Sequence, residues 1–228
     1  TLTLRVLIKD APDEVAQVGR TSDTTTQKSR FGYKWDFGTR LVNLGIWRDV
    51  LLVAQERYAL SEPYVSSDLE GDLGRIRCSG KVIAHCSGGE VLRVEAVAEL
   101  DGIVQTRGTF PVANGDFAGV LEIPQPALWY PNGWGKQPLY RVNLTLWAGE
   151  ERLDSWQCSQ GIRRLRFLQN ENAPEGALPY TYEVNGEKIY VKGVNFTPLD
   201  HIYGDIPDAQ YETSLEAAAA MGVNLIRV

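Results

Sequence analysis

The segment VLRVEAVAEL, residues 91–100, decides the fold class of this chain. Its apolar residues alternate with polar or small ones, which is the period of two expected for a strand with one buried face. The same alternation recurs in RIRCSGKVIAH (75–85), IVQTRGTF (103–110), FAGVLEI (117–123) and LYRVNLTLW (139–147). Gly, Asn and Asp turn residues separate these segments at short spacing. The pattern predicts a β-sandwich.

The sandwich should occupy residues 56–166. About seven strands fit between Glu56 and the closing segment RLDSWQCSQGIRRL (152–165), which is the number and length typical of an immunoglobulin-like domain. Residues 1–55 contain only the strand-like segments TLTLRVLI (1–8) and IWRDVLLVA (46–54), with a polar stretch between them. Two strands cannot make a stable sandwich alone. We therefore expect residues 1–55 to be the end of another β unit.

The last part of the chain changes character. KIYVKGVNF (188–196) predicts an apolar strand, DAQYETSLEAAAAMG (208–222) a helix with Asp208 as N-cap and Gly222 as stop, and VNLIRV (223–228) a second strand. Together they predict a βαβ unit. A parallel pair buried on both faces needs further strands and helices to cover it. We therefore expect an α/β domain that breaks off at Val228.

Composition and charge exclude several classes of function. The 228 residues are 43% hydrophobic, enough to fill sizeable cores, and the net charge of −6 comes from acidic and basic residues scattered along the chain. There is neither a nucleic-acid footprint nor a polybasic membrane patch, and no apolar run approaches the roughly 18 residues that cross a bilayer. We expect a small polar partner, no nucleic acid and no membrane. The compartment, cytoplasmic or periplasmic and secreted, stays open.

Cysteine and histidine usage argues against a metal centre or a disulfide framework. The three cysteines are odd in number and lack CxxC spacing, although Cys78 and Cys86 could pair across a hairpin. Neither His85 nor His201 has a partner at the spacing of metal ligands. We expect no metal and no cofactor.

The aromatic segment KSRFGYKWDFG (28–38) is the first candidate for function. A Trp beside an Asp at a β corner is usually a packed indole with a turn carboxylate, and the residues alone favour that role for Trp35 and Asp36. The alternative is a pair that faces a sugar. The indole would then stack on the ring's C–H face, and the carboxylate would accept hydrogen bonds from hydroxyls.

Three longer motifs follow one another along the chain: FGYKWDFGTRLVNLGIWRDV (31–50), LWYPNGWGKQPLYRVNLTL (128–146) and KIYVKGVNFTPLD (188–200) followed by AAMGVNLIRV (219–228). They resemble successive landmarks of glycoside hydrolase family 2, particularly its β-mannosidase branch. The resemblance implies a mainly β chain in three parts. Residues 1–55 would be the C-terminal part of a jelly-roll sugar-binding domain, 56–166 the immunoglobulin-like sandwich, and 167–228 a linker and the start of a (β/α)8 barrel.

The same resemblance favours the sugar-facing role of the aromatic segment over the packed one. Trp35 and Asp36 match a Trp-Asp pair that reaches the mouth of the barrel and binds the sugar, although Phe37 stands where the family often has another Trp. GVNFTPLD resembles the family's Asn-Trp-x-Pro-x-Asp segment, which makes Asn195 and Asp200 substrate-binding candidates. From the residues alone, Asp200 could equally belong to an Asx turn.

Arg227, near the end of VNLIRV, matches a family arginine beside the catalytic nucleophile. There a guanidinium would hold a carboxylate ionised and correctly turned. The alternative role is a buried ion pair in the barrel.

The activity implied is retaining hydrolysis of β-mannosides, which needs an acid/base and a nucleophilic carboxylate about 5 Å apart. The family's acid/base lies in an Asn-Glu pair, and neither QNENAP (169–174), a linker, nor VNGEK (184–188), a hairpin turn, fits. We expect no catalytic residue in this chain, both carboxylates beyond Val228, and a carbohydrate as partner, with the oligomeric state open. Alternatives are an exo-β-glucosaminidase or other family 2 β-glycosidase, and a non-catalytic carbohydrate-binding or adhesion protein built of sandwiches.

Overall fold

The computed structural model describes residues 3–12, 30–35, 38–55, 57–86 and 89–228, in which strands predominate, so the mainly β class is confirmed. Within these residues the chain forms two compact units, one made of residues 53–194 and 222–225, the other of residues 1–52, 195–221 and 226–228. No helix of the described residues is long and apolar enough to span a membrane.

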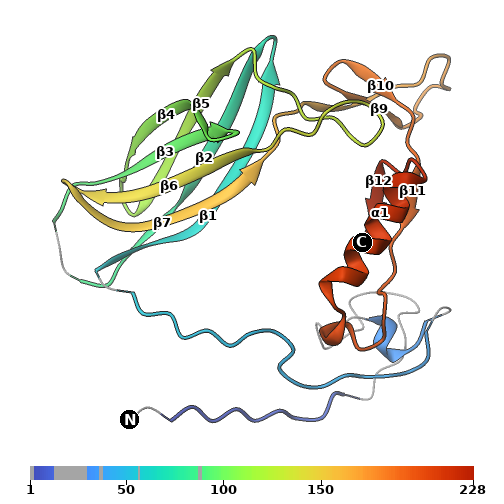
Figure 1. Cartoon of the computed structure of the whole chain (residues 1–228), viewed down its shortest axis with the longest axis horizontal. Coiled ribbons are helices and arrows are strands. Elements are labelled where there is room, and N and C mark those ends of the chain that lie inside the picture. The colour runs from blue at the N-terminus through green and yellow to red at the C-terminus, as the bar shows by residue number, and fades with distance from the viewer. Residues whose placement is uncertain (1–2, 13–29, 36–37, 56, 87–88) are drawn as a thin grey trace. The chain divides into compact units, whose positions relative to one another are not determined.

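The larger unit contains the predicted sandwich (Figure 1). One sheet has the strand order β1-β2-β5 and the other the order β4-β3-β6-β7, with antiparallel ladders throughout. The chain crosses from one sheet to the other three times, between β2 and β3, β4 and β5, and β5 and β6, as expected for an immunoglobulin-like sandwich. The strands are β1 (Tyr58–Glu70), β2 (Leu73–Ala84), β3 (Leu92–Leu100), β4 (Ile103–Pro111), β5 (Asp116–Pro124), β6 (Tyr140–Ala148) and β7 (Glu151–Gln160).

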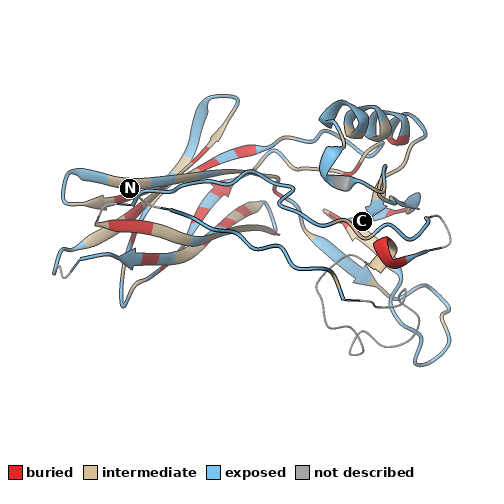
Figure 2. Cartoon of the chain, turned by 90° about the horizontal axis from the view of Figure 1, so that it is seen from below, coloured by how far each residue is buried: buried red, intermediate tan, exposed pale blue. Residues whose placement is uncertain are grey.

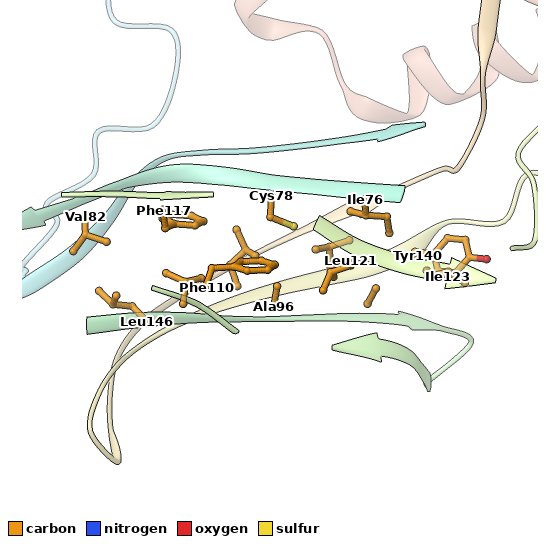
Figure 3. Close-up of a cluster of buried hydrophobic side chains, with 14 of the residues drawn as sticks. Ile76, Cys78, Val82, Ala96, Phe110, Phe117, Leu121, Ile123, Tyr140 and Leu146 are labelled. Carbon is orange, nitrogen blue, oxygen red and sulfur yellow. The ribbon is translucent and has the colours of Figure 1, made fainter. Parts of the chain in front are cut away.

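The core lies between the two sheets and follows the alternation read from the sequence. In β3, Val94, Ala96 and Ala98 are buried, and the residues between them are not. The buried bands alternate along the sandwich strands in Figure 2. Figure 3 shows side chains of both sheets meeting in one cluster, with Phe110 in its midst.

Phe110 needs glycines opposite its ring. A Cβ atom built on Gly119 of β5 would lie 2.0 Å from both Cδ1 and Cε1 of Phe110, and one on Gly108 would lie 3.2 Å from Cε1. Real Cβ atoms never approach a ring carbon to 2.0 Å. The core therefore has room for the large Phe110 side chain because positions 108 and 119 carry no side chain, as close packing requires.

The cysteines are free thiols, so the pairing of Cys78 with Cys86 that the sequence left open does not form. Cys78 is buried in the core, and Cys86 is exposed after the end of β2. Burial, helped by the nearby Cys158, raises the pKa of Cys78 to about 12, and burial also raises the pKa of Cys158. Both thiols therefore stay protonated at neutral pH, and Cys78 stays so over most of the alkaline range.

We expect a chromogenic disulfide reagent at pH 8 to modify one thiol of the native chain quickly, and that thiol to be Cys86. The thiolate is the reactive form, so a raised pKa and burial both slow Cys78 and Cys158. Cys86→Ser should abolish the fast phase, whereas full denaturation of the wild type should release all three thiols. Rapid reaction of two or more thiols in the folded chain would contradict this burial pattern.

After the sandwich, β8 (Leu165–Leu168), β9 (Thr181–Val184) and β10 (Glu187–Ile189) form a small antiparallel sheet. The turn between β9 and β10 consists of Asn185 and Gly186 with φ of +54° and +90°, as a type I′ hairpin requires. The hairpin turn predicted at VNGEK is thus confirmed. The single strand predicted over 188–196 is wrong, because β10 ends at Ile189 and pairs with β9, while the later residues pair with a different strand.

Those later residues begin the predicted βαβ unit, which is confirmed. It consists of β11 (Gly193–Asn195), η3 (Tyr203–Asp205), α1 (Asp208–Ala220) and β12 (Leu225–Arg227), with β11 beside β12. The two strands run in the same direction, because the Asn224 amide donates to the Lys192 carbonyl and the Phe196 amide to the Arg227 carbonyl.

Of the two predicted ends of the helix, the C-terminal one is confirmed and the N-terminal one is wrong. Gly222 has φ +78° and ends the helix, as expected for a glycine at this position. Asp208 is not the N-cap: that place belongs to Pro207, whose extended backbone leads into the helix, and no side chain caps it. Asp208 is instead the first helical residue, where its carboxylate still interacts favourably with the helix dipole.

The strands predicted over 1–8 and 46–54 do not form within the described residues. Residues 3–12 and 46–55 have no ladder partner there, and side chains such as Leu7 and Leu52 are 81% and 94% exposed. A strand is stable only when a neighbouring strand pairs with its backbone groups. Among the described residues before the sandwich, the regular element is the short 3₁₀ helix η2 (Arg30–Tyr33).

Candidate functional site

The aromatic segment is anchored by Tyr33, the last residue of η2. Tyr33 is only 2% exposed, and the guanidinium carbons of Arg30 and Arg40 lie 4.5 and 5.2 Å from its ring centre. Cations over an aromatic face are attracted by the ring's negative π surface. The amide of Leu41 also donates to the carbonyl of Gly32 at 2.9 Å. These contacts hold the chain on both sides of Trp35.

Trp35 and Gly38 form an isolated antiparallel bridge, in which they exchange two backbone hydrogen bonds of 3.2 Å. The backbone of Lys34 has φ +123°, a conformation that L-residues rarely adopt. Trp35 itself is 41% exposed, which is more than a core indole would be. Asp36 and Phe37 lie outside the described residues.

The second predicted segment folds into the loop after β11. Asp200 closes an Asx turn, because its Oδ1 accepts a hydrogen bond from the amide of Ile202 at 2.8 Å. The turn that the residues alone suggested is therefore present. It places His201 at the tip, and the side-chain amide of Asn43 donates to the His201 carbonyl at 2.5 Å.

His201 brings the two segments together. A Cβ atom on Gly38 would lie 2.6 Å from Nε2 of His201, so the imidazole edge rests against the glycine that is bridged to Trp35. This Nε2 atom is buried and has no hydrogen-bond partner in the described part of the chain. Gly38 is thus a glycine because its neighbour leaves no room for a side chain.

Asn195 and Arg227 form a second pair at the ends of β11 and β12. The Arg227 guanidinium donates to Oδ1 of Asn195 at 3.4 Å, and both residues are exposed. The buried ion pair considered for Arg227 does not form within the described residues. The carboxyl ends of parallel strands are where barrel enzymes build their active sites.

The structure therefore gathers the sequence-predicted residues in two groups of the smaller unit. Trp35 and Asp200 flank the contact between Gly38 and His201, and Asn195 pairs with Arg227. Asn43 and His201 were missed as site residues. The sequence raises His201 only as a possible metal ligand. Its position directly after Asp200 is the one sequence feature that links it to this segment. Among the described residues, no group of three His, Cys, Asp or Glu side chains could hold a metal ion.

The fold and this site can now be compared with known proteins. Residues 64–163 match the family model described as glycosyl hydrolases family 2. The part of the chain that resembles this family model is therefore the sandwich. The match runs from within β1 to just beyond β7 and contains the second of the three motifs, so it bears out the resemblance for the sandwich.

Curated relatives of the whole chain are β-mannosidases. The chain is 28% identical over 210 residues to Beta-mannosidase B of Thermothelomyces thermophilus and 27% identical over 233 residues to Beta-mannosidase B of Emericella nidulans, matches that cover 92% and 100% of this chain. The chain spans about a quarter of those proteins, 24% and 27% of their length.

A solved structure gives the same result. The β-D-mannosidase from Dictyoglomus thermophilum is 27% identical, with a TM-score of 0.77 over 88% of this chain and 25% of that one. The fold of this chain is therefore similar to that of a β-mannosidase.

Proposed function

We propose that the protein hydrolyses β-mannosides with retention of configuration, and that this chain carries part of its substrate-recognition surface. The observation behind the proposal is the contact between Gly38 and His201. It joins two segments, both of which resemble sugar-binding segments of the family, although they are far apart in sequence. The names of the curated relatives supply the substrate class.

In this proposal Trp35 offers its exposed indole to a sugar ring, and Asp36 accepts hydrogen bonds from sugar hydroxyls. Asp200 also fits this role, because the Asx turn occupies one oxygen with a single amide donor and a carboxylate has about four acceptor sites. Asn195 retains its side-chain amide as a donor while its Oδ1 faces Arg227. Arg227 would orient the nucleophilic carboxylate by a charge-assisted hydrogen bond.

The reacting carboxylates belong to segments outside this chain in our proposal. A general acid must have a raised pKa, whereas the hydrogen bond and charge of Lys188 lower the pKa of Glu171, the glutamate of QNENAP. We likewise propose that residues 1–55 end a sugar-binding domain and that residues 167–228 begin a barrel. The fraction of the relatives' length that the chain covers leaves room for both.

The test is a panel of aryl β-glycosides offered to the whole protein, with the anomeric product followed by NMR. We expect the β-mannoside to be cleaved with a higher kcat/KM than the β-glucoside or β-glucosaminide, and the first product to be the β-anomer. The 228-residue chain alone should show no turnover. Preference for the β-glucosaminide would favour an exo-β-glucosaminidase instead. Absence of hydrolysis by the whole protein would favour the non-catalytic, carbohydrate-binding class.

A further inference from the structure

The outer face of the four-stranded sheet carries a groove that the proposed catalytic role does not use. The groove lies on β6 and β7 and has a volume of about 600 Å³, within the range of ligand-binding pockets. Residues that lie opposite one another on the two strands line the groove: Asn143 pairs with Gln157, and Thr145 with Ser155, in the β6–β7 ladder. The groove therefore lies within the sandwich unit and depends on well-ordered strand pairing.

The lining residues combine amides, hydroxyls, one guanidinium and two tryptophans, Trp147 and Trp156, of which Trp156 also packs against the core. Asn143 and Gln157 can each donate and accept hydrogen bonds, and Thr145 and Ser155 add hydroxyls that do both. Trp147 contributes an aromatic ring at the end of the row. A ligand with many neutral hydroxyls and apolar C–H faces would satisfy all of these groups at once.

Two arginines beside Trp147 determine which side of its indole faces the groove. The guanidinium carbon of Arg93, from β3, lies 5.7 Å from the indole ring centre, and Arg93 donates to the carbonyl of Gly149. Arg93 is not part of the groove lining, whereas Arg152, the β7 neighbour of Trp147, is. The groove thus opens on the β7 side of the indole, with Arg93 supporting the β3 side.

The charge and polarity of the lining exclude other ligands. Its single charged side chain, Arg152, donates to Oγ of Ser155 at 2.6 Å, so the site lacks the clustered cations that a phosphate requires. It contains no aliphatic side chain, although the centre of a protein–protein interface is apolar. Asn143 and Trp147 lie four residues apart on one face of β6, about 13 Å along the strand. This length suits a short chain of sugar rings.

We propose that this groove binds a short neutral oligosaccharide, with Trp147 stacking on one ring and Asn143 and Gln157 hydrogen-bonding the hydroxyls of the next. The inference does not depend on the proposed hydrolytic activity, because it concerns the sandwich alone. It gives the sandwich a function of its own, which is to hold a glycan on a surface formed by its own strands β6 and β7.

The experiment is an NMR titration of the ¹⁵N-labelled 228-residue chain with β-1,4-mannotriose. We expect saturable shifts of the Trp147 indole N–H and of the side-chain amides of Asn143 and Gln157. Trp147→Ala and Gln157→Ala should each raise Kd at least fivefold, whereas Trp147→Phe, which keeps a ring, should restore much of the affinity. Because Gln157 is exposed on the edge strand, its replacement should leave the fold intact.

Arg141→Ala is the matched control. Arg141 is exposed on β6, on the same face as Asn143 and Trp147, but it lies outside the groove lining. It should bind mannotriose like the wild type. The proposal is overturned if the titration causes no saturable shifts, if the shifts fall only outside the groove, or if Gln157→Ala binds as tightly as the wild type. Because the readout is binding, loss of hydrolysis in the whole protein would not count against it.

Discussion

Replacing Gly119 with alanine should destabilise the sandwich by about 3 kcal/mol, the upper end of the usual cost of overpacking a core. The added methyl group would need the space that the Phe110 ring occupies, at 2.0 Å from two of its atoms. The ring cannot move aside easily, because it lies in the middle of the core cluster (Figure 3). For a domain of this size the loss lowers Tm by roughly 10 °C or more.

Chemical denaturation of the 228-residue chain measures this effect, and Gly89 provides a matched control. A Cβ atom on Gly89 meets nothing within 4 Å, so Gly89→Ala should leave the stability within a few tenths of a kcal/mol. Adding Phe110→Leu to Gly119→Ala should cost less than the sum of the two single changes, because the smaller side chain relieves the clash. If Gly119→Ala matches Gly89→Ala in stability, the packing described for Phe110 is wrong.

The sandwich could be predicted because its information is local. An alternating pattern specifies which face of a strand is buried, and β3 and β6 bury the residues that this pattern selects. The pattern does not identify the partner of a strand. For this reason the segment 188–196 was predicted as one strand, although its two ends pair with β9 and β12.

The same limit explains the error at the N-terminal segments. Residues 1–8 and 46–54 alternate as strands do, but the described residues offer no backbone partner for them. The helix start failed for a local reason: Asp208 is a good N-cap by type, yet Pro207 before it already has the extended conformation of a cap residue.

The candidate site shows what sequence motifs can and cannot supply. The resemblance selected Trp35, Asn195 and Asp200 by residue type and order. It could not show that Gly38 touches His201 or that Asn43 bonds to the His201 carbonyl, since the latter pair is 158 residues apart in the chain. Those contacts depend on how the chain returns to itself.

The largest functional effect should follow from removing the carboxylate of Asp36. We expect Asp36→Ala to lower kcat/KM of the whole protein on β-mannosides by about 1.5 to 3 kcal/mol, roughly ten- to a hundredfold or more, because a hydrogen bond from a sugar hydroxyl to a charged group would be lost in the transition state. Tm should barely change. Asp49→Ala, which removes an exposed carboxylate of the same N-terminal segment, should leave kcat/KM unchanged.

In the proposed function, the segment that contains Trp35 and Asp36 recognises the sugar. The most direct test of this role is kcat/KM of wild type and Asp36→Ala on an aryl β-mannoside and on its deoxy analogues, each lacking one hydroxyl. We expect a large difference in kcat/KM between the two proteins on the parent mannoside and nearly equal values on the one analogue that lacks the contacted hydroxyl. Equal values of kcat/KM on the parent mannoside, or an Asp36→Ala protein that no longer folds, would instead assign Asp36 to the packing of the structure.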